Sequence, residues 1–129
     1  MVNEIKANSN KEIALSFLRF VVAGKIREGY ERFVAKEFIH HNPHFLGDRE
    51  SLLIAMEKNQ VQFPNKILEV KHVIEEGNLV MLHSSMRPNP ISPALALLHL
   101  FRFKGDKIVE LWDMAQPVPV DSINERAMF

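Results

Sequence analysis

The residue with the clearest potential for chemistry is Asp113, a carboxylate that directly follows the apolar pair Leu111-Trp112. A carboxylate buried among apolar side chains must be paired, hydrogen-bonded or protonated, and such groups cluster at functional sites. Asp113 therefore has two interpretations. It is either a base that takes a proton from the carbon next to a carbonyl group, or a hydrogen-bonding aspartate at the end of a strand.

Two histidines, His72 and His83, could donate hydrogen bonds to the enolate that such chemistry produces. They flank Gly77-Asn78, a dipeptide typical of a two-residue hairpin turn, and this turn places them opposite each other with Cβ atoms about 5 Å apart. Their face also carries apolar side chains, so we expect it to be buried: Leu68, Val70, Ile74 and Met81. Both histidines could instead be core residues bonded to backbone or water.

A second hairpin around Gly105-Asp106 defines the surroundings of Asp113. A two-residue turn there places Leu98 opposite Asp113, and Leu100 opposite Leu111. We therefore expect these leucines to form an apolar wall around the carboxylate. A bulge would shift this register by one residue and exchange the two faces.

The opposite face of this hairpin pairs Phe101 with Glu110 and His99 with Trp112. Aromatic residues are enriched at protein interfaces, and zero net charge removes one obstacle to self-association. We therefore expect a homodimer through the sheet face that carries Phe101 and Trp112.

Three further histidines, His40, His41 and His44, suggest a metal site because imidazole is a common metal ligand. Adjacent histidines on an extended segment point in opposite directions, however, and no acidic or cysteine partner completes a recognised spacing. We therefore predict no metal, and interpret these histidines as residues of a loop.

The elements that position these residues follow from caps, turns and apolar spacing. Ser9 and Glu12 have the spacing of a capping box, Gly24 suits a helix end, and Asp48 can cap a later helix. Helices followed by a meander of strands predict an α+β domain. The expected elements are a helix between Ser9 and Gly24, helices over 26–33 and 49–61, an extended segment over 38–43, and strands over 68–76, 79–87, 95–104 and 107–115.

Composition excludes several classes of function. The 129 residues include 16 basic and 16 acidic side chains, so no basic excess favours nucleic-acid binding. The lack of cysteine excludes disulfides and thiolate chemistry. No apolar run approaches the roughly 20 residues of a membrane span, and the first residues lack a signal-peptide pattern. We expect a single cytoplasmic domain over residues 1–129, with neither a nucleic-acid nor a membrane partner.

Three segments carry a resemblance to a known family. They are the stretch from Phe38 to Pro43, the strand around His83, and the run from Phe101 to Asp113 followed by Gln116-Pro117. Together they resemble the SnoaL-like polyketide cyclase family, which belongs to the nuclear-transport-factor-2-like fold superfamily. The resemblance covers nearly the whole chain. It implies a cone-shaped α+β fold, in which helices and a curved, mostly antiparallel sheet enclose a pocket, and usually a homodimer through the sheet.

The resemblance also implies cofactor-independent ring closure by aldol condensation, with an acidic residue of the last strands as acid and base. Asp113 matches that residue, His41-Asn42 matches a polar pair near the pocket mouth, and His83 matches a histidine common in one subgroup. Two positions depart from the pattern: Leu111 replaces a frequent histidine, and His99 replaces a frequent acidic residue.

We therefore predict a cofactor-independent carbon-acid enzyme, of the aldol-condensation/cyclase or isomerase type, that acts on a small carbonyl compound in an internal pocket. One alternative is a dimeric protein that binds a small hydrophobic ligand without chemistry, which Leu111 favours. Another is a structural dimer module. The predicted catalytic residues are Asp113 and His83, and the predicted ligand-binding residues are His41, Asn42, His72, Gln116, Leu98 and Leu111.

Overall fold

The first helix has the predicted boundaries in the computed structural model, which describes residues 8–129. Helix α1 (Asn10–Val22) begins with a capping box. The Ser9 hydroxyl accepts from the backbone N–H of Glu12 at 3.1 Å, and the Glu12 carboxylate accepts from the backbone N–H of Ser9 at 2.9 Å. The chain leaves the helix at Gly24, whose φ of +83° lies in the region that glycine tolerates best.

Helices α2 (Ile26–Phe33) and α3 (Arg49–Gln62) also confirm the sequence prediction. The carboxylate of Asp48 caps α3 by accepting from the backbone N–H of Ser51 at 3.0 Å. Gly29 is a poor helix former inside α2, and the packing explains its presence. A Cβ at Gly29 would lie 3.0 Å from the Cβ of Phe20, so glycine permits the close approach of α1 and α2.

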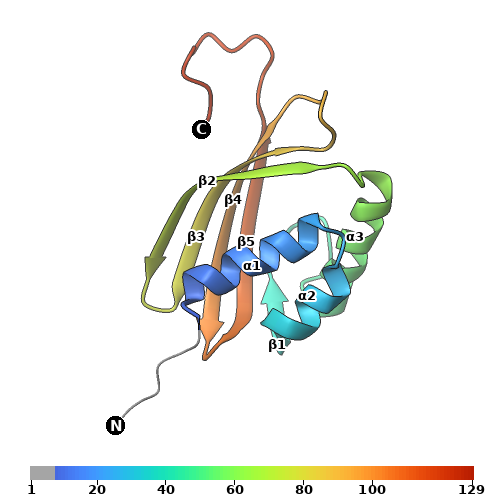
Figure 1. Ribbon diagram of the computed structural model, residues 1–129, viewed down its shortest axis with the longest axis vertical. Helices are drawn as coiled ribbons and strands as arrows, with labels where there is room; N and C mark the ends of the chain where they lie inside the picture. The colour runs from blue at the N-terminus through green and yellow to red at the C-terminus, as the bar shows by residue number, and fades with distance from the viewer. Residues whose placement is uncertain (1–7) are drawn as a thin grey trace.

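Five strands form one mixed sheet, so the predicted α+β class is confirmed. The extended segment expected from Phe38 is a strand that begins earlier, at Val34. It pairs in parallel with the last strand, whereas the other neighbours are antiparallel. Figure 1 shows the helices gathered on one face of the curved sheet, which we call the inner face. The strands are β1 (Val34–His40), β2 (Ile67–Glu76), β3 (Leu79–Arg87), β4 (Leu95–Lys104) and β5 (Lys107–Pro117), in the order β1-β5-β4-β3-β2.

The first hairpin has the predicted pairs, but its buried face is not the predicted one. His72 pairs with His83 as expected, yet Ile74 beside them is 62% exposed. The fully buried side chains of β3 are Val80, Leu82 and Ser84, which point to the inner face. A bulge between Val70 and His72 explains the error, because it places Leu68 and Val70 on the inner face but His72 on the outer face.

The second hairpin also contains a bulge, which corrects the predicted surroundings of Asp113. Val109 and Glu110 both lie opposite Arg102, so the register beyond them shifts by one residue. Asp113 pairs with His99 instead of Leu98, and Phe101 pairs with Leu111. Phe101 is fully buried on the inner face, whereas Trp112 lies on the outer face. The prediction that Phe101 and Trp112 share one dimer face is therefore wrong.

The core fills the space between the helices and the inner face. The Phe17 ring of α1 packs edge-on against Tyr30 and Phe101, with ring centroids 5.4 Å and 5.9 Å away. Tyr30 and Phe101 are among the largest fully buried side chains. This aromatic cluster anchors α1 and α2 to the middle of the sheet and leaves the end near His99 for a cavity.

Candidate active site

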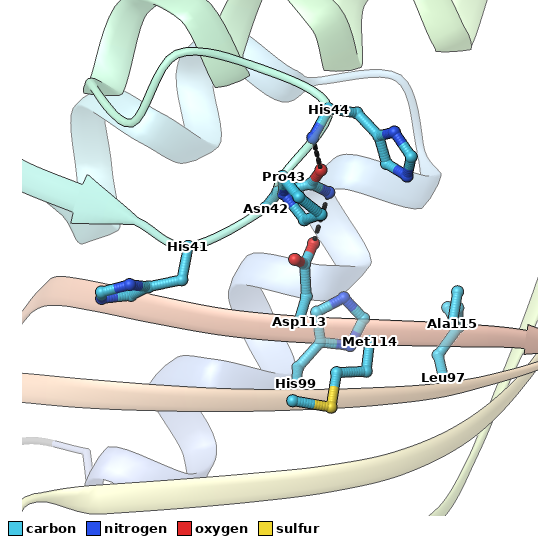
Figure 2. Close-up of a pocket in the computed structure, with 9 residues that line it drawn as sticks. All are labelled: His41, Asn42, Pro43, His44, Leu97, His99, Asp113, Met114 and Ala115. Atoms are coloured by element: carbon cyan, nitrogen blue, oxygen red, sulfur yellow. Dashed lines mark hydrogen bonds between the residues drawn. The ribbon is translucent and has the colours of Figure 1, made fainter.

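Asp113 lies on the inner face beside His99 and below the loop that follows β1. The side-chain amide of Asn42 donates to Asp113 Oδ2 at 3.2 Å. Figure 2 shows the carboxylate between Asn42 above it and the imidazole of His99 on the neighbouring strand. Three segments that are distant in sequence thus meet at one carboxylate, and each contributes one polar side chain.

The loop that carries Asn42 is held by His40, which is 5% exposed. The Nδ1 of His40 accepts from the backbone N–H of Asn42 at 3.1 Å, and its Nε2 lies 2.6 Å from the carbonyl oxygen of Leu46. Because Nδ1 is an acceptor, Nε2 is the ring donor. The side-chain oxygen Oδ1 of Asn42 also accepts from the backbone N–H of His44 at 2.9 Å. These bonds fix the amide of Asn42 over Asp113.

Two polar atoms of the pair remain without a partner among residues 8–129. They are Nδ1 of His99 and Oδ1 of Asp113, and both atoms are buried. Burial lowers the pKa of His99, although the negative charge of Asp113 opposes this effect. The imidazole is therefore neutral at neutral pH. A neutral imidazole next to a carboxylate offers one donor and one acceptor to a ligand, and unpaired buried groups of this kind are uncommon in folded proteins.

These groups face a cavity of about 340 Å³, which we call the inner cavity. Its volume lies within the range of small-molecule sites, and its wall is mostly apolar. A second cavity of about 470 Å³ adjoins it at Asn42, His99 and Asp113 and includes His41 and His44; we call it the mouth cavity. The inner cavity is lined by Phe17, Leu18, Val21, Asn42, Phe45, Leu52, Ala55, Met56, Asn59, Lys66, Met86, Leu95, Leu97, His99, Phe101, Leu111, Asp113 and Ala115.

The structure brings together only some of the residues predicted for the site. Asn42, Leu111 and Asp113 line the inner cavity, and His41 lines the mouth cavity. The other four predicted residues lie on the outer face or its rim, because successive strand residues point to opposite faces. They are His72, His83, Leu98 and Gln116.

His83 is the most important correction, because it does not meet Asp113. Its row across the sheet runs through Leu98 and Met114 on the outer face. Its Nδ1 lies 3.0 Å from Nδ1 of His72, and its Nε2 lies 2.9 Å from the carbonyl oxygen of Met128. The expectation that His83 and Asp113 share one pocket is therefore wrong.

His41 turns away from Asp113, as Figure 2 shows. Its ring stacks on Trp112 with centroids 4.8 Å apart, and its Nε2 lies 2.7 Å from a carboxylate oxygen of Glu110. Arg102 binds the other oxygen of Glu110 at 2.8 Å. The hydrogen bond from His41 and then the contact with Arg102 lower the pKa of Glu110. His41 thus ties the mouth loop to β5.

Sequence reasoning missed His99, Asn59 and Lys66. His99 was assigned to the wrong face because the bulge at Val109 has no clear signal in the sequence. Asn59 and Lys66 lie near the end of α3 and just before β2, where a polar residue is ordinarily solvent-exposed. Only the packing of α3 against the sheet shows that both line the inner cavity.

Two features are absent from residues 8–129. No group of three or more His, Cys, Asp or Glu side chains lies close enough to hold a metal ion. In the same part of the chain, no helix has the length and apolar character needed to cross a membrane.

Comparison with protein families identifies the chain. Residues 12–121 match the model of the SnoaL-like polyketide cyclase family. The chain therefore belongs to the SnoaL-like polyketide cyclase family. A search of curated proteins gave no match.

Solved structures share the fold. An NTF2-like protein of unknown function from Cytophaga hutchinsonii is 20% identical, with a TM-score of 0.67 over 87% of this chain and 95% of that one. A candidate polyketide cyclase from Acidithiobacillus ferrooxidans is 16% identical, with a TM-score of 0.70 over 87% and 92%. IdmH, a candidate polyketide cyclase from Streptomyces antibioticus, is 17% identical, with a TM-score of 0.68 over 84% and 93%. At these identities the likeness shows the NTF2-like fold, and function must be argued from the site.

Proposed function

We propose that the protein is a cofactor-independent carbon-acid enzyme, of the aldol-condensation/cyclase or isomerase type, that acts on a small carbonyl compound in the inner cavity. The observation that carries this proposal is the pair of Asp113 and His99, whose buried Oδ1 and Nδ1 atoms have no partner within the described residues. A carbonyl compound supplies what each atom lacks, because it brings an acidic C–H bond and an oxygen acceptor together.

In the proposed step, Asp113 Oδ1 takes a proton from the carbon next to the carbonyl group. The electron pair of that C–H bond forms the C=C bond of an enolate, and the carbonyl π electrons move onto oxygen. An N–H of the neutral His99 ring donates to this oxygen, where negative charge develops. The protonated Asp113 then returns its proton, either to another carbon in an isomerisation or to the alkoxide formed when the enolate carbon attacks a second carbonyl group.

The remaining cavity residues hold this pair in place. The amide of Asn42 binds Oδ2 of Asp113, so Oδ1 is the oxygen that remains for the substrate proton. Leu111, which is 4% exposed, contributes an apolar part of the wall that excludes water and strengthens the polar contacts. The enolate-stabilising role predicted for His83 is thus assigned to His99.

The test is hydrogen–deuterium exchange at the central carbon of acetylacetone and of 1-phenylbutane-1,3-dione, followed by NMR. We expect Asp113→Asn to slow the protein-catalysed exchange by about 10²–10⁴-fold, and His99→Leu by about 10²–10³-fold. His83→Leu should retain the wild-type rate because His83 lies on the other face. Equal losses in His83→Leu and Asp113→Asn, with both variants folded, would place the chemistry elsewhere.

A second function, binding without chemistry, is favoured by the apolar lining and by Leu111 in a position where a histidine is common in one subgroup. It predicts that both diketones bind to the wild-type protein while their exchange rates stay equal to those in buffer. Exchange above the buffer rate that depends on Asp113 excludes this alternative.

A homodimer through the outer face is part of the proposal. Several large apolar side chains there are well exposed in the single chain, and contiguous exposed apolar surface marks interaction sites. The stacked pair of Trp112 and His41 lies beside them. These exposed side chains are Ile74, Met81, Leu98 and Met114.

A further inference from the structure

The inner cavity has one charged side chain at each end, although the catalytic proposal uses only Asp113. Among its lining residues the second charged group is Lys66, and Asn59 lies next to it. The Lys66 ammonium donates a hydrogen bond to the side-chain carbonyl oxygen of Asn59. Lys66 is partly buried between the end of α3 and the start of β2.

The charge of Lys66 is not balanced within the described chain. No carboxylate of residues 8–129 forms an ion pair with it, whereas Lys71, the fifth residue of β2, pairs with Glu69 at 3.5 Å. Burial lowers the pKa of the Lys66 ammonium, since no anion offsets the loss of hydration. The ammonium has three donors, and Asn59 accepts one of them. Two donors remain for an anion in the cavity.

Lys66 and Asp113 are well separated along the sheet. Lys66 lies beyond the row of Leu68, Met86 and Leu95, whereas Asp113 pairs with His99. His99 and Leu95 are four residues apart on β4, which corresponds to about 13 Å along the strand. A ligand that reaches both ends must therefore be extended, and the wall between them is apolar.

We propose that Lys66 and Asn59 bind a carboxylate group of the ligand at the end of the inner cavity opposite Asp113. The substrate class is then an apolar carbonyl compound that carries a carboxylate remote from its reacting carbon. That this carboxylate belongs to a substrate rests on the proposed function. The binding of a carboxylate by Lys66 does not depend on it. In this arrangement the ammonium orients the ligand so that its carbonyl end meets Asp113 and His99.

The test compares two probes, 4-(3-oxobutanoyl)benzoate and its methyl ester, in which a methyl group removes the negative charge of the carboxylate. Their affinities for the whole protein are measured by isothermal titration calorimetry. Lys66→Met should weaken binding of the carboxylate by about tenfold or more and change binding of the ester by less than about twofold, because it removes a charge-assisted hydrogen bond. Lys66→Arg should retain most of the preference. Lys58→Met, an exposed lysine of α3 outside the cavity, is the matched control and should change neither affinity.

The two proposals fail in different ways in the same samples. The carboxylate site is overturned if Lys66→Met weakens binding of both probes equally, or weakens binding of neither. Circular dichroism checks that the variant is folded. Lys66→Gln repeats the comparison if Lys66→Met does not fold. Exchange at the central carbon of both probes is followed in parallel and compared with the rate in buffer. If wild type exchanges neither probe while Lys66 still determines the carboxylate preference, the catalytic proposal fails and the binding site stands.

Discussion

Replacing His99 by leucine should make the protein more stable and less active. Nδ1 of His99 is buried without a partner among the described residues, and such a group costs about 1–3 kcal/mol. Leucine has a similar size and removes the unpaired atom, so we expect the free energy of unfolding to rise by about that amount. For a chain of this length, about 4 °C of melting temperature corresponds to 1 kcal/mol. The enolate donor is lost in the same substitution.

The comparison should be made with the same substitution at His40. Both ring nitrogens of His40 are bonded, one to the backbone N–H of Asn42 and one to the carbonyl of Leu46. His40→Leu leaves these two backbone groups without partners, so it should lower the free energy of unfolding by about 1–3 kcal/mol or more. Urea denaturation of wild type and the two variants, at one pH and salt concentration, gives both values.

The sign of the His99→Leu effect is the decisive result. A loss of stability comparable to that of His40→Leu would show that Nδ1 is satisfied in the folded protein, and the basis for its role as a ligand donor would be gone. A gain of stability with an unchanged exchange rate would show that the unpaired Nδ1 has no role in catalysis. Only a gain in stability together with a slower exchange agrees with a group held ready for a substrate.

Three further predictions concern the rest of the molecule. Glu110→Gln should destabilise the protein most at neutral pH. The lowered pKa of Glu110 stabilises the fold at pH values above the usual pKa of 4.5, and this contribution disappears as the pH falls through the folded-state pKa. Urea midpoints of wild type and variant in acid and at neutral pH test this, and a difference that does not depend on pH contradicts it. Gly29→Ala should lower the free energy of unfolding by about 1–3 kcal/mol, although alanine has the better helix propensity by roughly 1 kcal/mol, because the new Cβ would meet the Cβ of Phe20. A higher melting temperature of the variant would show that α1 moves aside easily. Leu98→Asp should dissociate the proposed dimer, because Leu98 is 41% exposed on the outer face; sedimentation velocity measures this, and an unchanged dimer excludes that interface.

The sequence was sufficient to predict the elements because their signals are local. The capping box at Ser9, the cap at Asp48 and the two glycine-containing turns each involve residues within a few positions of one another. The strand that begins at Val34 was predicted too late, because its pairing with β5 joins segments more than 70 residues apart. Its local pattern does not reveal a parallel partner.

The site was predicted only in part because strand faces depend on bulges. Asp113 and Asn42 were identified from residue type and family resemblance, and they do meet. His83 was placed with them by a register that is locally correct, but the inner face of β3 is set by packing against the helices. Both faces of each hairpin carry apolar residues, so composition could not decide which face is buried.

The bulge at Val109 also affects how this chain can change in length. Because Val109 and Glu110 share one opposing residue on β4, a strand that is one residue shorter at this point can pair with β4 in a regular ladder. Leu111 and Asp113 would keep their partners and would still face the cavity. A deletion beyond Leu111 would instead shift the following residues by one position and exchange their faces, so that Met114 would point toward the ligand. Insertions and deletions among relatives should therefore be tolerated near the turn and selected against next to the carboxylate.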